Sequence, residues 1–111
     1  MTSPKINFSP KGLFIGGKWV DSYKGERFST INPSNGQHLG EVPLAEKEDV
    51  NRAVIAAKQA FQDWGKMPLK ERAGFLIKLA DKLSENRDEL GIMDCVDSGN
   101  ALNGMKGDVD W

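Results

Sequence analysis

The chain changes from strands to helices at residues 46–64, which read EKEDVNRAVIAAKQAFQDW. Apolar side chains recur in this stretch with the period of an α-helix and therefore fall on one helix face: Val50, Ala53, Val54, Ala57, Phe61 and Trp64. Acidic residues crowd the expected first turn, where negative charge suits the helix dipole. Gly65 follows directly and favours a glycine cap at the C-terminal end.

A second helix is expected over residues 69–84. Pro68 precedes it, at a position where the missing N–H of proline costs nothing. The apolar residues of this segment keep the helical period, with Arg72 as the polar exception. Asn86 then interrupts the pattern.

Two further helices are expected over residues 87–97 and 101–111, with a turn at 98–100. Each carries apolar residues at helical steps: Leu90, Met93 and Val96 in the third helix, and Leu102, Met105 and Val109 in the fourth. The apolar pattern of the fourth helix runs up to Trp111 without a closing glycine, proline or basic turn. The chain therefore looks interrupted there.

The residues before 46 alternate short β-prone runs with turn residues. Two pairs of runs flank turn sequences and predict two hairpins: 13–15 and 18–20 around Gly16-Gly17, then 28–31 and 38–42 around residues 32–36. Residues 1–12 are polar and contain prolines and a glycine, so a flexible N-terminal arm is expected. Residues 13–111 are then one domain of hairpin strands followed by amphipathic helices.

The bulk composition excludes several classes of protein. The 111 residues carry 15 basic and 16 acidic side chains, a net charge of −1 that does not favour nucleic acid or an anionic membrane as a partner. A single cysteine cannot form an internal disulfide and favours a reducing compartment. No apolar run is long enough to span a membrane, and no secretory signal is evident. These observations predict a cytoplasmic protein.

Candidate catalytic residues are scarce. His38 stands alone in an expected strand, and Cys95 lies between Asp94 and Asp97, a poor setting for a reactive thiolate. A buried, inert cysteine is the expectation. The acidic pairs on the expected helices, such as Glu48 with Asp49, are interpreted as exposed charged faces. Neither a dinucleotide-binding glycine motif nor a P-loop is present.

The order of sequence blocks from about Leu13 to Trp111 resembles the aldehyde dehydrogenase superfamily. Each block is weak alone, but their order and spacing together are specific: LFIGGKWV at 13–20, FSTINPSNG at 28–36, EDVNRAVIAA at 48–57, AFQDW at 60–64, ERA at 71–73, ENRDEL at 85–90 and DSGN at 97–100. The resemblance covers only the leading part of that family's longer chain. It implies an α/β fold in which these residues begin the nucleotide-binding domain and pack on a parallel sheet supplied by later residues.

The resemblance also implies a function. The family oxidises an aldehyde to a carboxylic acid: a cysteine thiolate attacks the carbonyl, hydride passes to NAD or NADP, and a glutamate activates the water that hydrolyses the thioester. These catalytic and cofactor-binding residues all lie downstream of this segment, and Cys95 does not match the catalytic motif. A dimer or tetramer is expected, and this segment alone is expected to be inactive.

One family site maps onto this segment. Several members hold a monovalent cation with backbone oxygens of the T-[IV]-N-P segment and with the aspartate of the D-x-G block. Here those residues are Thr30, Ile31 and Asp97. Oxygen ligands suit a hard cation, but a plain turn and a helix-end aspartate without an ion explain the same residues.

Some positions depart from the family pattern and leave the substrate open. Ser34-Asn35 replaces the common Ala-Thr, Gln37 replaces a frequent Glu, Pro68 stands where a Ser or Thr cap is usual, and Asn100 stands where Lys is common.

Two alternative functions follow from the residues. The helices at 46–64 and 69–84 could pair as an αα-hairpin that offers an apolar groove to a partner. The chain could also be a truncated decoy that joins a dehydrogenase oligomer.

Overall fold

The computed structural model describes residues 11–111, so the expected arm at residues 1–12 lies almost wholly outside the described residues. The first hairpin pairs β1 (Leu13–Ile15) with β2 (Lys18–Val20) in antiparallel register. Gly16 and Gly17 form its turn with φ values of 59° and 77°. Two consecutive positive φ angles match the twist of a tight hairpin, which explains the glycine pair.

The second hairpin pairs β3 (Arg27–Ile31) with β4 (His38–Pro43). Its turn closes where the backbone N–H of Gly36 donates to the carbonyl of Asn32 at 2.8 Å. The pairing register shifts between Thr30 and Ile31. The two hairpins form separate two-stranded sheets.

The described residues contain four helices: α1 (Lys47–Trp64), α2 (Leu69–Glu85), α3 (Arg87–Ser98) and α4 (Leu102–Val109). The expected ranges of the first three are confirmed to within a residue. The expected range of the fourth was wrong, because α4 ends before Trp111. Gly104 and Gly107 lie within its eight residues, and glycine weakens a helix, as does acidic charge at the C-terminal end. No helix among these residues is long and apolar enough to cross a membrane.

The helices α3 and α4 pack closely against each other. At Gly91 a side chain would meet the Cγ of Lys106 at 2.6 Å, so glycine permits the approach. Ion pairs tie the two helices together: Lys106 to Asp88 at 2.7 Å, and Arg87 to Asp110 at 2.7 Å. This helix pair also supplies the best-covered apolar side chain of the described residues, Val96, which is 8% exposed.

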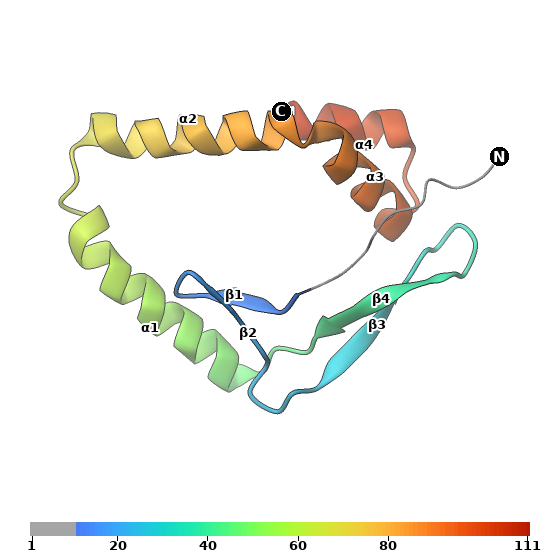
Figure 1. Ribbon diagram of the computed structural model, residues 1–111, viewed down its shortest axis with the longest axis horizontal. Helices are drawn as coiled ribbons and strands as arrows, with labels where there is room; N and C mark the ends of the chain where they lie inside the picture. Colours follow the sequence, from blue (N-terminus) through green and yellow to red (C-terminus); the bar gives the residue numbers. More distant parts are fainter. Residues whose placement is uncertain (1–10) are drawn as a thin grey trace.

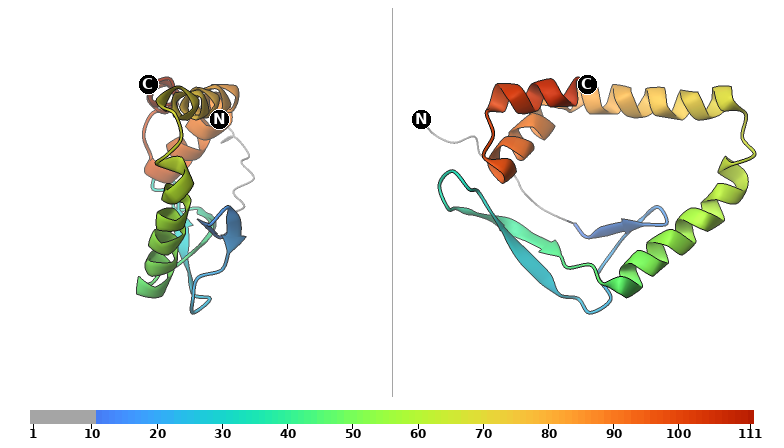
Figure 2. Two further views of the ribbon diagram at one scale, coloured as in Figure 1. Left: turned by 90° about the vertical axis from the view of Figure 1, so that its left-hand side faces the viewer. Right: turned by 180° about the vertical axis from the view of Figure 1, so that it is seen from behind.

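The remaining elements form an open, flat frame. Figure 1 shows α2 along the top, α1 down one side, the hairpins below and the α3–α4 pair at the other end. Seen edge-on in Figure 2, the frame is thin, and its extents are 52 × 36 × 17 Å. Its radius of gyration is 17.1 Å, whereas a compact chain of this length has about 13 Å. Large apolar side chains are therefore left uncovered on both α1 and α2.

The relation between α1 and α2 corrects one expectation. The two helices diverge from their connection at residues 65–68 and do not pack along their length as an αα-hairpin (Figure 1). Gly65 does follow the end of α1, but its φ of −65° is right-handed, not the left-handed conformation of a glycine cap. A side chain at Gly65 would lie 2.9 Å from the carbonyl of Phe61, so close approach explains this glycine.

Candidate functional site

Two residues of the expected cation site lie together. The Thr30 hydroxyl on β3 donates a hydrogen bond of 2.6 Å to the Oδ1 atom of Asp97 in the last turn of α3. Thr30 is half-buried and Asp97 is exposed. The contact joins the second hairpin to α3, and we call it, with the neighbouring contact of Gly99, the hairpin–α3 junction.

Gly99 allows α3 to reach the hairpin. It ends α3 in the left-handed conformation, with φ of 77°, and its N–H donates to the carbonyl of Cys95 at 3.0 Å. A Cβ at this position would lie 2.9 Å from the Cγ of Pro33. Both the backbone angle and the lack of a side chain therefore bring the end of α3 onto the turn after β3.

The donor types of the expected cation site are those that suit a hard cation and not a transition metal. Their donors are oxygens: the backbone carbonyls of Thr30 and Ile31 and the carboxylate of Asp97. The side chain of Ile31 is exposed and adds no donor. Residues 11–111 contain no group of three or more His, Cys, Asp or Glu side chains placed to hold a metal ion. A single carboxylate beside neutral oxygens suits a monovalent ion better than a divalent one.

The other candidates from the sequence do not assemble a catalytic centre. His38 is exposed at the start of β4. Cys95 is a free thiol, but it is half-buried, so the expectation of a buried cysteine was wrong in degree.

Asp49 was misassigned from the sequence. We expected an exposed charged face, yet Asp49 is 1% exposed. Its carboxylate accepts hydrogen bonds from the backbone N–H groups of Tyr23 at 2.9 Å and Glu46 at 2.9 Å, and it forms an ion pair with Arg52. The carboxylate thus ties the turn after β2 to the first turn of α1.

These partners also explain the acidity of Asp49. The hydrogen bond from the Glu46 backbone is the main cause that holds the pKa of Asp49 below its ordinary value; burial opposes it, and Arg52 and the Tyr23 N–H lower the pKa further. The acidic residue three positions after Glu46 was the sequence signal for this role, since a side chain there reaches back to the N-cap backbone.

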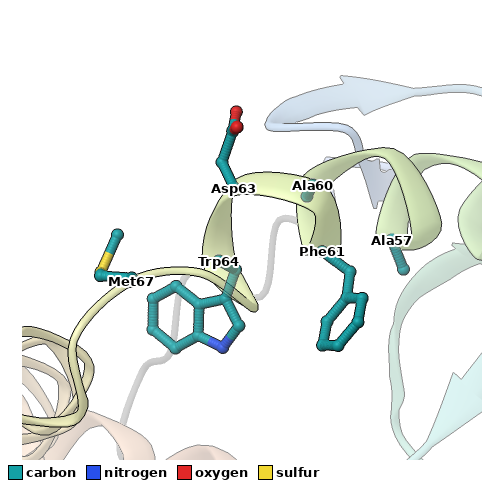
Figure 3. A pocket seen from close by; sticks show the side chains of 6 residues that line it. All are labelled: Ala57, Ala60, Phe61, Asp63, Trp64 and Met67. Atoms are coloured by element: carbon teal, nitrogen blue, oxygen red, sulfur yellow. The ribbon is translucent and has the colours of Figure 1, made fainter.

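An apolar groove of about 550 Å³ lies at the C-terminal end of α1. Figure 3 shows that the rings of Phe61 and Trp64 project to the same side of α1, while Asp63 points away. Met67 continues the groove into the connection to α2. Phe61 is 65% exposed, so the groove offers apolar surface to solvent.

The groove is continuous with α2. The Trp64 ring contacts the Phe75 ring at a centroid distance of 5.7 Å. Arg72 lies one turn before Phe75, and its Nε atom is buried without a hydrogen-bond partner among the described residues. A guanidinium N–H removed from water normally has an acceptor, so this atom is an exception that needs an explanation.

The described residues do not fit a dinucleotide. The glycines with positive φ lie in turns between strands or at the end of α3: Gly16, Gly17, Gly25, Gly36 and Gly99. None of them opens a helix, and a pyrophosphate is bound by N–H groups at a helix N-terminus.

Comparison with known proteins decides the family. The model of the aldehyde dehydrogenase family matches residues 19–111. The chain belongs to the aldehyde dehydrogenase family. Its resemblance in sequence and its α/β fold as the beginning of the nucleotide-binding part are thereby confirmed.

The relatives are much longer than this chain. It is 41% identical over 92 residues to cytosolic 10-formyltetrahydrofolate dehydrogenase of Xenopus tropicalis, covering 81% of this chain and 10% of that protein. It is 41% identical over 96 residues to malonate-semialdehyde dehydrogenase of Halalkalibacterium halodurans, covering 86% of this chain and 20% of that protein. This aldehyde dehydrogenase chain thus spans a fifth or less of these two relatives.

A solved structure shows the same arrangement of elements. Betaine aldehyde dehydrogenase of Staphylococcus aureus, crystallised with NAD+, superposes with a TM-score of 0.85 at 31% identity, covering 90% of this chain and 20% of that one. The open frame is therefore shared with a much longer chain.

Proposed function

We propose that these residues form the first segment of an NAD(P)-dependent aldehyde dehydrogenase that oxidises an aldehyde to a carboxylic acid through a cysteine thioester. The observation that carries the proposal is the family match over residues 19–111. The catalytic cysteine, its glutamate and the cofactor-binding residues belong to the part of the family chain that this segment does not span. The segment alone is therefore proposed to be inactive.

The role proposed for the segment is structural. Its hairpins and helices brace the nucleotide-binding domain and contribute to contacts in a homodimer or homotetramer. The hairpin–α3 junction is proposed to hold a monovalent cation with Thr30, Ile31 and Asp97. Such an ion would link the hairpin to α3 and supply no redox chemistry.

The cofactor and the location stay predictions. The NAD+ bound to the betaine aldehyde dehydrogenase neighbour supports NAD, and NADP is the alternative. The single cysteine supports the cytoplasm as the location. The substrate is proposed only as an aldehyde.

The first experiment is to read the coding DNA beyond the codon for Trp111. We expect the frame to continue and to supply a glycine-flanked cysteine and a glutamate motif. The encoded protein should then reduce NAD or NADP with an aldehyde, whereas residues 1–111 should not. A stop codon directly after Trp111 would overturn the proposal that this chain is part of an active dehydrogenase.

A decoy is the second candidate, and the uncovered apolar faces of α1 and α2 favour it. A decoy of this kind would occupy the place of the same segment in a dehydrogenase oligomer. The test is to mix the chain with the parent dehydrogenase and measure its activity. If a large excess of the 111-residue chain left the activity of the parent dehydrogenase unchanged, the decoy would be excluded.

A further inference from the structure

Asn35 and Gly36 lie in the turn that joins β3 to β4. Both residues are exposed, and Gly36 has a positive φ of 74°. In an asparagine–glycine pair the backbone nitrogen of the glycine can attack the side-chain carboxamide, because no Cβ shields that nitrogen. The ring that forms is a succinimide, and its hydrolysis leaves a carboxylate in place of the amide.

The hydrogen bonds of this turn prepare the Asn35 carboxamide for such an attack. The backbone N–H of Gln37 donates to the Oδ1 atom of Asn35 at 2.9 Å, so the side chain folds back across the intervening Gly36 peptide. The same N–H lies where negative charge develops on Oδ1 when the carboxamide carbon becomes tetrahedral. The Nδ2 atom, which would leave, donates to the Oε1 atom of Gln37 at 3.2 Å.

The turn also holds the attacking nitrogen. The N–H of Gly36 donates to the carbonyl of Asn32 at 2.8 Å, and this bond must open before the nitrogen can lose its proton. Exposed turns with few buried contacts open locally at a small cost in free energy. This hydrogen bond therefore slows the reaction of the turn but does not block it.

A second asparagine–glycine pair provides an internal comparison. Asn103 and Gly104 are also exposed, but they lie in the first turn of α4. The N–H that corresponds to that of Gln37 belongs here to Met105, and it donates to the carbonyl of Ala101 at 3.1 Å. The helical backbone must also be broken to bring the Gly104 nitrogen to the Asn103 carboxamide. The same dipeptide is therefore set for reaction in the turn and not in the helix.

We propose that Asn35 is a site of self-modification, at which the Gly36 nitrogen converts the asparagine into isoaspartate or aspartate with water as the only co-reactant. The nitrogen loses its proton to solvent and forms a bond to Cγ of Asn35. The bond from Cγ to Nδ2 breaks, and that nitrogen leaves as ammonia. Water then opens the ring at either carbonyl: one opening gives aspartate, and the other leaves the backbone running through the former side-chain carbon as isoaspartate.

The site is independent of the proposed function, since only the turn and water take part. It is also particular to this chain. Threonine, which is common at position 35 in the family pattern, has no carboxamide and cannot form the ring.

The modification should be felt at the hairpin–α3 junction. A Cβ at Gly99 would meet the Cγ of Pro33 at 2.9 Å and the hydroxyl oxygen of Ser34 at 3.5 Å, so the turn lies against the end of α3, as Figure 1 also shows. Isoaspartate lengthens the backbone of the turn by one methylene group and adds a negative charge, and both changes disturb this packing. Aspartate adds the charge alone.

The test is a timed incubation of the 111-residue chain at mildly alkaline pH, followed by peptide mapping with mass spectrometry. In the folded chain Asn35 should lose its amide about ten times faster than Asn103, a modest factor because an exposed oxyanion donor contributes less than a buried one. In concentrated urea the two rates should become equal, since both dipeptides are then unfolded. Equal rates in the folded chain, or a preference of the same size in urea, would overturn the proposal.

Two variants test the effect on the junction. After incubation of the unmodified chain, amides at the end of α3 should exchange hydrogen several-fold faster in the fraction that carries isoaspartate. Asn35→Ser keeps a small polar turn residue that cannot form the ring, so the same incubation should leave its exchange unchanged. Freshly prepared Asn35→Asp carries only the charge and should stay closer to the fresh unmodified chain than to the isoaspartate fraction. Equally accelerated exchange in the incubated Asn35→Ser variant would overturn the assignment to Asn35.

Discussion

The hydroxyl of Thr30 and the carboxylate of Asp97 meet at 2.6 Å although 67 residues separate them in the chain. The hydrogen bond connects the second hairpin to the end of α3, two parts of the frame that otherwise share little surface. Because the elements of this chain lack a large common core, such single contacts determine how the parts are placed.

The first prediction concerns this hydrogen bond. Thr30→Val keeps the shape of the side chain and removes the hydrogen-bond donor. The free energy needed to open the hairpin–α3 junction should therefore fall by about 1 kcal/mol. Hydrogen exchange of the amides at the end of α3 should become faster. Ser29→Ala removes a neighbouring exposed hydroxyl on β3 and should leave that exchange unchanged. Equal exchange in the Thr30→Val variant and the unmodified chain would show that the contact does not hold the junction.

The second prediction concerns the proposed cation. For the 111-residue chain, potassium or sodium should raise the melting temperature relative to an equal concentration of a bulky organic cation. A site with Kd of about 10 mM at 100 mM salt would stabilise the fold by about 1.4 kcal/mol. Asp97→Asn should abolish the difference between the salts, while Asp94→Asn on the same helix should preserve it. A melting temperature that does not depend on the cation would refute the site.

The third prediction separates two roles of glycine. Gly99→Ala should destabilise the chain more than Gly36→Ala, by about 1 kcal/mol. Both glycines have positive φ, 77° and 74°, but only a Cβ at Gly99 would collide with Pro33, whereas nothing lies within 4 Å of one at Gly36. Chemical denaturation followed by circular dichroism measures both. An equal loss for the two variants would mean that the turn after β3 moves aside at no cost.

The sequence predicted the elements better than their arrangement. Local signals were sufficient for the hairpin at Gly16-Gly17 and for the limits of α1 and α2, because turn glycines and helical periodicity act over a few residues. The divergence of α1 from α2 was missed. It depends on contacts between surfaces that are distant in sequence, which local patterns do not report.

At the candidate site, too, local sequence signals did not predict which distant residues meet. Thr30 and Asp97 were paired only through the family resemblance, since nothing local brings residues 67 apart together. Asp49 was misread because an acidic residue in a first helix turn is usually exposed. Its burial follows from the position of Tyr23, whose N–H reaches the carboxylate from the preceding turn.

The fourth prediction is a pH dependence that originates at Asp49. The folded protein depresses the pKa of Asp49, so the carboxylate stabilises the fold above the unfolded value of about 3.9. This contribution is lost as the pH falls through the lower folded value. Asp49→Asn should therefore lower the melting temperature near neutral pH and show a smaller further loss below about pH 4.

The control for Asp49 must account for other acids. Lys106 also lowers the pKa of Asp88, so the unmodified chain and the variant share that part of the acid response. Asp63→Asn is the matched variant, since Asp63 is an exposed acidic residue on the same helix. It should reproduce the pH profile of the unmodified chain. A profile of Asp49→Asn that runs parallel to the unmodified chain at every pH would refute the assignment.

The fifth prediction is that residues 1–111 alone bind a hydrophobic dye through the α1 groove. Phe61 is 65% exposed there, so Phe61→Gln should reduce dye binding while costing little stability, because an exposed side chain has few contacts to lose. Fluorescence titration and circular dichroism measure the two effects on the same samples.

Tyr23→Gln tests whether the dye reports the groove or apolar surface in general. Tyr23 is also exposed but lies in the turn after β2, away from the groove residues, so its loss should leave most of the dye binding intact. Equal reductions by both substitutions would mean that the dye does not favour the groove. A monomer that melts in one sharp transition with little dye bound would contradict the open frame itself, since a covered core is what produces such a transition.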